Sequence, residues 1–214
     1  MPAINFADVF IQFIVLLFSL TIHESAHAWS ADRLGDPTAR QLGRVSLNPI
    51  VHADLIGTVV FPLLAMIGGL PLLGWAKPVP VSVRNLRHHR RDYVLVAAAG
   101  PASNLALAVS AALVLALLPI SPFRIGEPNV TAPIANLLSF ALRINVLLAV
   151  FNMVPIPPLD GGNVLGGLLP MRLAILFNRI RPYGFILLYA LILTDGYNYV
   201  VAPPYRFIVS WLSR

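Results

Sequence analysis

The sequence predicts an all-α polytopic membrane protein, a bundle of about four to six membrane helices. Hydrophobic residues make up 57% of the 214 residues and charged residues only 11%, whereas an average soluble domain is roughly 45–50% apolar and about 25% charged. The mean hydropathy is +0.78, and the apolar residues are grouped in long runs. The composition argues against a soluble globular enzyme, and it excludes a disordered or collagen-like chain.

The net charge of +6 and the absence of cysteine narrow the chemistry further. Without cysteine, a metal site has to use His, Asp, Glu or backbone oxygen ligands. The basic residues lie between the apolar runs, where the positive-inside rule explains them more simply than nucleic-acid binding does. We therefore expect the lipid bilayer as a partner, and no nucleic acid.

The first apolar run covers residues 6–31. It lacks the basic start and the small-residue cleavage site of a signal peptide, so we expect a membrane helix. The second run, 55–73, is interrupted by glycine and proline at Gly57, Pro62, Gly68, Gly69 and Pro71. Irregular backbone at membrane depth is tolerated where it lines a cavity or is buried in protein. We favour a re-entrant element for this run over a full crossing.

The later runs differ in length and in their interruptions. Residues 93–118 form a long uninterrupted run, and residues 134–154 form a further membrane-length run. Residues 183–193 form a short run that ends before Asp195. Residues 207–212 are expected to lie at the membrane interface, with neighbouring aromatic side chains as anchors.

Most Lys and Arg residues lie in the segments 33–53, 75–92 and 170–182, whereas the 119–133 loop carries only Arg124. The positive-inside rule places the three basic segments in the cytoplasm and the 119–133 loop outside. We therefore expect a multi-pass protein of the cell (plasma or inner) membrane, with its basic loops toward the cytoplasm.

Two stretches between the runs, 41–47 and 76–83, have extended character. We expect a small β-hairpin or extended edge element near the cytoplasmic surface. Pro78 and Pro80 exclude a central strand, and an exposed edge can pair with an extended substrate. Together with run 55–73, the segment 77–83 is expected to control access to the functional site.

The residues His23-Glu24-Ser25-Ala26-His27 form an H-E-x-x-H motif within the first run. Residues i and i+4 lie on one face of a helix, so both imidazoles can bind one metal ion, and Glu24 can reach a water bound to it. Ionisable residues inside a membrane helix are costly and usually functional. The alternative is a set of polar residues at a helix end, satisfied by water and their neighbours.

A catalytic zinc ion usually has three protein ligands and an open position, so a third ligand is needed. His52, Asp54 and Asp160 remain candidates by membrane level and side. Asp160 follows a proline-rich stretch that ends a helix, at the membrane level of His23 and His27, although an Asp before Gly-Gly is usually a turn residue. His52 and Asp54 are equally explained as a surface turn and a helix cap, or as residues that orient a zinc-bound histidine.

These motifs together resemble the site-2 protease family of intramembrane zinc metalloproteases. The resemblance rests on the H-E-x-x-H motif and on Asn152-x-x-Pro155-x-Pro157-Pro158-Leu159-Asp160-Gly161. Gly100-Pro101-Ala102-Ser103-Asn104 resembles the family's G-P-x-x-N element, and the segments 43–49 and 75–80 resemble the compact prokaryotic branch. No stretch is long enough for the PDZ domain that several family members carry.

The resemblance implies one Zn²⁺ per chain, bound by His23, His27 and Asp160, with Glu24 as the catalytic base. It also implies a role for Asn152 near the reacting carbonyl, although an interhelical hydrogen bond is its alternative. For Gly100 and Asn104 we expect close helix packing and an interhelical hydrogen bond.

The expected function is hydrolysis of a peptide bond within or beside a transmembrane segment of a membrane-protein substrate, with the active site toward the cytoplasmic side. We expect a single membrane metalloprotease domain over 1–214, with a catalytic core at about 6–34, 92–119 and 131–169 and accessory parts at about 54–91 and 171–214. The alternative function is a zinc-binding membrane transporter or metal-delivery protein that uses the same ligands. A transporter needs no general base, so Glu24 distinguishes the two.

Overall fold

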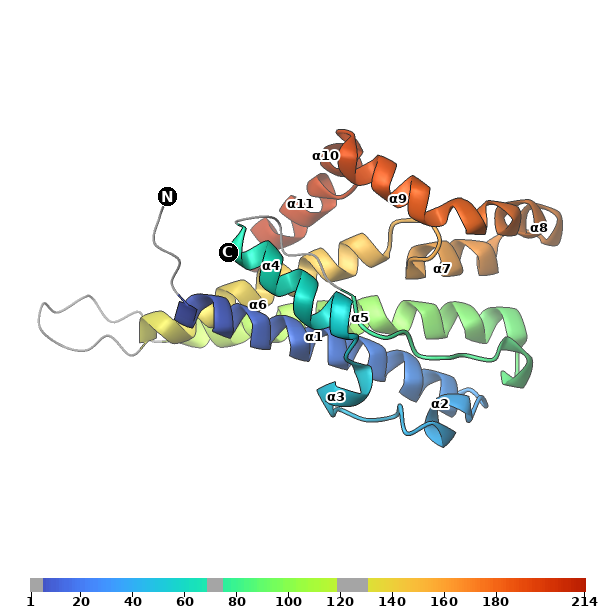
Figure 1. Ribbon diagram of the computed structural model, residues 1–214, viewed down its shortest axis with the longest axis horizontal. Helices are drawn as coiled ribbons and strands as arrows, with labels where there is room; N and C mark the ends of the chain where they lie inside the picture. The colour runs from blue at the N-terminus through green and yellow to red at the C-terminus, as the bar shows by residue number, and fades with distance from the viewer. Residues whose placement is uncertain (1–5, 69–74, 119–130) are drawn as a thin grey trace, which may run out of the picture.

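The computed structural model describes residues 6–68, 75–118 and 131–214, and within them the chain is helical and contains no strand (Figure 1). Four helical segments are long and apolar enough to cross a membrane, namely Val9–Arg33, His89–Leu117, Ala132–Asn152 and Met171–Leu193. The predicted class of all-α polytopic membrane protein is therefore confirmed.

Three long helices lie side by side and form the centre of the fold (Figure 1). They are α1 (Phe6–Arg33), α5 (His89–Leu117) and α6 (Thr131–Asn152). On α5 the buried residues recur at helical spacing and are mostly small, which lets the neighbouring helices approach closely. These residues are Val96, Ala97, Gly100, Pro101, Asn104, Ala108 and Ala111, together with Asp92 in the first turn.

A second group of helices follows α6 and lies beside the central three (Figure 1). It comprises α7 (Asp160–Leu168), α8 (Met171–Ile180), the 3₁₀ turn η3 (Arg181–Tyr183), α9 (Gly184–Leu193), α10 (Gly196–Val200) and α11 (Ala202–Leu212). The side chain of Arg90 on α5 donates hydrogen bonds to Gly167 O and Leu169 O and so holds the end of α7.

The C-terminal helix α11 contains residues 207–212, the segment expected at the membrane interface. Tyr205, Ile208, Val209 and Leu212 pack against buried residues of α5 and α6, while Trp211 stays exposed. One face of α11 therefore belongs to the helix bundle.

The second apolar run forms the π-helix η1 (Leu55–Val60) and then α4 (Phe61–Ile67). At about 1.5 Å per residue this helix is shorter than a hydrocarbon core of roughly 30 Å. Trp75 N–H donates to Gly57 O at 3.0 Å, and Thr58 Oγ1 donates to Trp75 O at 2.8 Å. The chain is thus back beside the start of η1 at residue 75, which favours a re-entrant element. The breaks at Gly69 and Pro71 lie outside the described residues.

The expected β-hairpin is wrong for the part of the chain that the structure describes. The first stretch instead follows the short helix α2 (Thr38–Gln41) and precedes α3 (Pro49–His52). The second runs extended from Ala76 to the 3₁₀ turn η2 (Val83–Asn85) without a strand partner. Pro78 and Pro80 have no N–H to offer to a neighbouring strand.

The extended segment is held by other parts of the chain instead. Lys77 N–H donates to His52 O at 2.8 Å, and the buried Arg44 guanidinium donates to Lys77 O at 2.9 Å and Pro78 O at 3.1 Å. Ala76 is buried in one cluster with Leu16 and Leu20 of α1. The segment therefore lies directly against α1.

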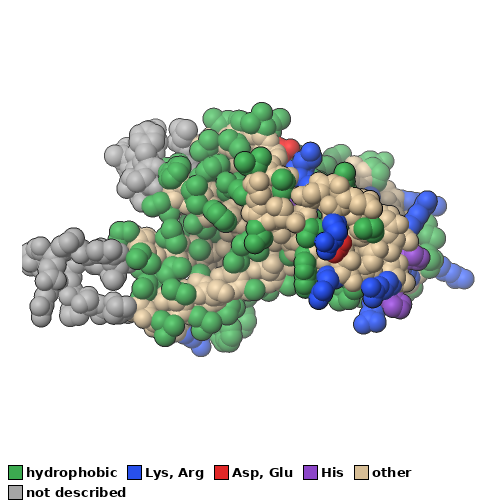
Figure 2. Space-filling model, turned by 90° about the horizontal axis from the view of Figure 1, so that it is seen from below, with side chains coloured by type: hydrophobic (Ala, Val, Ile, Leu, Met, Phe, Trp, Pro, Cys, Tyr) green, Lys and Arg blue, Asp and Glu red, His purple; other side chains and the backbone are tan. Residues whose placement is uncertain are grey.

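The space-filling view shows how charge is distributed on one face of the molecule. In Figure 2 the Lys, Arg and His side chains gather toward one end, and hydrophobic side chains cover much of the remaining described surface. This separation is what a protein with one basic, water-facing end and a lipid-facing body requires.

Candidate metal centre

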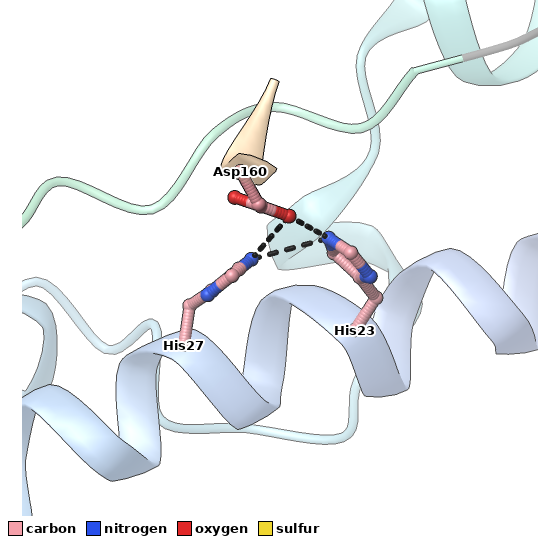
Figure 3. Close-up of side chains that lie close together, drawn as sticks. All are labelled: His23, His27 and Asp160. Carbon is pink, nitrogen blue, oxygen red and sulfur yellow. Dashed lines mark hydrogen bonds and ion pairs between the residues drawn. The ribbon is translucent and has the colours of Figure 1, made fainter. Parts of the chain in front are cut away.

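Three predicted ligands meet at one point between α1 and α7 (Figure 3). His23 and His27 lie one turn apart on α1, and their Nε2 atoms are 3.1 Å apart. Asp160 Oδ2 lies 3.1 Å from His23 Nε2 and 3.4 Å from His27 Nε2. The two imidazoles are buried, so these atoms face one another away from bulk solvent.

Asp160 reaches this point because of the turn that precedes it. After α6 ends at Asn152, a proline-rich turn leads to Asp160 as the first residue of α7. A Cβ on Gly161 would overlap the carbonyl of Met153, and one on Gly162 would lie 2.7 Å from Pro157 N. The two glycines therefore let α7 pack against its own preceding turn, rather than forming the tight turn that their sequence suggested.

The hydrogen bond at Nδ1 of each imidazole determines which ring nitrogen carries the proton. His27 Nδ1 lies 2.7 Å from the carbonyl oxygen of Val96, which only accepts hydrogen bonds, so Nδ1 is the donor. His23 Nδ1 lies 2.5 Å from Asn104 Oδ1. With both Nδ1 atoms protonated, both Nε2 atoms direct lone pairs toward Asp160.

This donor set fits a zinc ion. In the neutral tautomers, two imidazole lone pairs and a carboxylate oxygen face one another with no proton between them, and Asp160 Oδ2 is buried without a hydrogen bond. Ligands at roughly 2.0–2.1 Å in tetrahedral zinc sites stand about 3.3–3.4 Å apart, close to the 3.1, 3.1 and 3.4 Å found here. A cation at this point would relieve the repulsion between the lone pairs.

Gly100 of α5 leaves the space in which the two imidazoles lie. A Cβ at this position would overlap His27 Nε2 and would lie 2.6 Å from His23 Nε2. The expectation of close packing at Gly100 is thus met, but what packs there is the pair of imidazoles.

The remaining sequence-predicted residues lie around this centre in different ways. The Glu24 carboxylate accepts a hydrogen bond of 2.9 Å from Val79 N–H in the extended segment. The Asn152 amide donates to Leu148 O, 3.0 Å away in its own helix.

His52 and Asp54 are not part of the cluster. His52 Nε2 lies 2.8 Å from Ser46 O, and the Asp54 carboxylate caps η1 by accepting from Ile56 N–H and Gly57 N–H. Asn104 is the residue whose contact the sequence did not reveal, because the expected interhelical hydrogen bond ends on an imidazole of the metal centre.

The fold and this centre define a membrane protein with a candidate metal site built from an H-E-x-x-H helix and a distant aspartate. Comparison with known proteins agrees. The sequence is 37% identical over 190 residues to "Putative zinc metalloprotease YwhC" of Bacillus subtilis, covering 89% of this chain and 83% of the relative. It is 30% identical over 197 residues to "Putative zinc metalloprotease Rip2" of Mycolicibacterium smegmatis, covering 91% and 71%.

Residues 118–194 match the profile of peptidase family M50. No solved structure matches the chain. Taken with the similarity to YwhC, which extends over most of both chains, these findings show that the chain belongs to peptidase family M50, the site-2 protease family of zinc metalloproteases.

Proposed function

We propose that the chain is an intramembrane metalloprotease that hydrolyses a peptide bond within or next to a transmembrane segment of a membrane-protein substrate. The observation that carries this proposal is the meeting of His23, His27 and Asp160 at one buried point of a membrane-length helix. Buried ionisable groups in such a helix are retained where they serve a function.

In this proposal His23 and His27 bind zinc through Nε2, and Asp160 binds it through a carboxylate oxygen. Zinc, when bound, activates water and polarises the scissile carbonyl. Gly100 keeps open the space that the imidazoles need. The hydrogen bonds from both Nδ1 atoms keep the lone pairs of Nε2 available.

Glu24 is the proposed general base, because it is the carboxylate of the H-E-x-x-H motif and follows His23 directly. It takes a proton from the attacking water and later passes it to the leaving amine. One of its oxygens accepts from Val79 N–H, which fixes the carboxylate beside the extended segment.

The substrate helix must unwind locally, since a helical amide is shielded by its own hydrogen bonds. We propose that the extended segment 76–83 lies beside the unwound substrate and that Asn152 binds the substrate backbone. For that role, the Asn152 amide has to leave Leu148 O. The basic end of the molecule in Figure 2 supports an active site toward the cytoplasmic side.

Glu24→Gln tests this function. The purified full-length protein is incubated in detergent with a polypeptide that carries one transmembrane segment with a helix-breaking Gly-Pro pair. We expect Glu24→Gln to keep one zinc per chain and to lose about 10²–10⁴-fold in hydrolysis rate, because Gln cannot accept the proton. Asp160→Ala should lose both zinc and hydrolysis.

The outcome separates the protease from a zinc-binding transporter. A transporter would still carry zinc into vesicles in the Glu24→Gln variant. The wild type and the variants would then show the same absence of peptide hydrolysis. Appreciable turnover by Glu24→Gln would contradict the general base. Full zinc occupancy in Asp160→Ala would contradict the third ligand.

A further inference from the structure

Three buried polar side chains outside the H-E-x-x-H motif form a continuous hydrogen-bonded chain that ends on the metal centre. They are Ser19 of α1, Asn104 of α5 and Asn145 of α6, each no more than 2% exposed. Each lies inside a helix long and apolar enough to cross the membrane. Burying such groups is costly unless every donor has an acceptor, so their pairing can be followed atom by atom.

The direction of this chain is set by a backbone carbonyl of α6. Asn145 Nδ2 donates to Ala141 O at 2.8 Å and to Ser19 Oγ at 2.9 Å. A carbonyl oxygen only accepts hydrogen bonds, so the amide nitrogen of Asn145 must face Ala141. The amide oxygen of Asn145 must therefore face Asn104.

The same reasoning fixes Asn104. Its Nδ2 donates to Asn145 Oδ1 at 2.8 Å, with Ser19 O at 3.4 Å on the same side. If the amide of Asn104 were turned over, its oxygen would face two acceptors and its nitrogen would face His23. In the observed orientation, Asn104 Oδ1 faces His23 Nδ1 at 2.5 Å.

The last step concerns the imidazole. Because Asn104 Oδ1 accepts, His23 Nδ1 must carry the proton, and Nε2 keeps its lone pair for a metal ion. A hydrogen bond of this kind on the second nitrogen also fixes the ring orientation and raises ligand basicity. His27 needs no such chain, because its Nδ1–H donates directly to the backbone carbonyl oxygen of Val96.

We propose that Asn145 and Ser19, acting through Asn104, are positioning residues that select the zinc-binding tautomer of His23. The inference rests on the proposed ligand set of His23, His27 and Asp160. Helix packing alone would explain why these three polar side chains bond to one another. It would not require the two amides to point in one particular direction, and the proposal gives that direction a function. Asn104 holds the imidazole, and Asn145 holds Asn104 in the accepting orientation.

Zinc affinity of the purified full-length protein, measured by competition with a chelator, tests this proposal. Asn104→Leu keeps the volume but removes the acceptor, and we expect zinc binding to weaken about 10–100-fold. Asn104→Asp keeps an oxygen facing His23 but replaces the donor to Asn145 Oδ1 with a second oxygen, so we expect a smaller loss of zinc affinity than in Asn104→Leu. Asn145→Leu leaves Asn104 in place but frees its amide to turn, so we expect a smaller loss.

The double variant distinguishes a directed chain from independent packing. If Asn145 acts through Asn104, Asn104→Leu/Asn145→Leu binds zinc no more weakly than Asn104→Leu alone. Thr21→Val is the matched control, because Thr21 is 1% exposed and its hydroxyl donates to Leu17 O of the same helix rather than to the chain of Ser19, Asn145 and Asn104. It should bind zinc as the wild type does.

A second measurement separates positioning from stability. Thermal unfolding of the metal-free variants reports packing alone, and selective ¹⁵N labelling reports the Nδ1–H of His23 among the five histidines of the zinc-loaded protein. The proposal is overturned if Asn104→Leu and Asn145→Leu lower the unfolding temperature while zinc affinity and the His23 Nδ1–H signal stay as in wild type. If Asn104→Leu does not fold, Asn145→Leu and Asn104→Asp decide by the same criteria.

Failure of the proposed ligand set gives a different result. In that case His27→Ala would bind zinc as tightly as the wild type, or the wild type would bind none, and the positioning proposal would fall with the ligand set. If the wild type binds zinc through His27 and Asn104→Leu is unchanged, only the positioning proposal fails.

Discussion

Gly100 of α5 faces the Nε2 atom of His27 so closely that a methyl group on Gly100 would overlap that nitrogen. The same methyl group would lie 2.6 Å from Nε2 of His23. Both atoms belong to imidazoles held from behind by hydrogen bonds to Asn104 and Val96. These hydrogen bonds restrain both rings against moving away from an added methyl group.

Gly100→Ala is therefore expected to disrupt the metal centre while adding a single methyl group. Metal analysis of the purified variant should show a large loss of zinc, and hydrolysis should fall with it. Gly166→Ala is the matched control, because its Cβ would lie 3.5 Å from Phe177 and make an ordinary contact. Zinc retention by Gly100→Ala at the level of Gly166→Ala would contradict this account.

The H-E-x-x-H pair could be predicted from the sequence because helical geometry alone places His23 and His27 on one face. The place of Asp160 beside this pair could not be predicted in the same way, because nothing local distinguishes Asp160 from His52 or Asp54. The proline-rich turn and the close packing of α7 bring Asp160 to the two imidazoles. Only the resemblance to a family supplied that information in advance.

The β-hairpin was wrong, whereas the interhelical hydrogen bond expected of Asn104 is present and only its partners were not predicted. The extended character of 76–83 was predicted correctly, but the segment forms hydrogen bonds with Glu24, Asp36, Arg44 and His52 rather than with another strand. For Asn104, the sequence indicated an interhelical hydrogen bond but not that it would end on His23. Both outcomes depend on which distant side chain occupies the facing position.

Asp36 provides a prediction about pH and stability. This buried carboxylate follows α1 and accepts hydrogen bonds from Thr38, Ser82 N–H and the Asn85 amide. Burial opposes its ionisation, but these hydrogen bonds outweigh burial and hold the pKa of Asp36 below its ordinary value of 3.8. A depressed pKa means that the carboxylate stabilises the fold above that ordinary value and loses this contribution as the pH falls below it.

Thermal unfolding between pH 7 and pH 3 tests this contribution. Asp36→Asn should be less stable than the wild type at pH 7, and the difference should shrink as the pH falls, because the wild type loses its carboxylate. Asp195→Asn is the control, since Asp195 is exposed and caps no helix through its side chain. A difference between wild type and Asp36→Asn that grows toward pH 3 would contradict the assigned direction.

The topology of run 55–73 can be tested by cysteine labelling, because the chain has no cysteine of its own. We expect Ser46→Cys and Ser82→Cys to react with a membrane-impermeant maleimide from the same, cytoplasmic side. Ser121→Cys, in the loop expected outside, should react from the opposite side. If Ser46→Cys and Ser82→Cys react from opposite sides, run 55–73 crosses the membrane.

The last prediction concerns access to the centre. The backbone of Val79 donates to Glu24, and the Arg44 guanidinium holds the carbonyls of Lys77 and Pro78 beside it. A substrate strand that reaches Glu24 has to displace or accompany this segment, so we expect the segment to move during each turnover. Lids of this kind move on the microsecond-to-millisecond scale.

A reversible crosslink tests this movement. The breaks in run 55–73 suggest a tether at Gly69, but this residue lies outside the described residues. The crosslink is therefore placed between Ala76→Cys and Leu20→Cys, because Ala76 and Leu20 belong to one buried cluster. Oxidation should suppress hydrolysis of a membrane-embedded substrate, reduction should restore it, and zinc content should stay constant, because neither Leu20 nor Ala76 is one of the three proposed ligands. Each single-cysteine variant controls for the substitution itself. Unchanged hydrolysis by fully crosslinked protein would show that substrate reaches Glu24 without moving the segment.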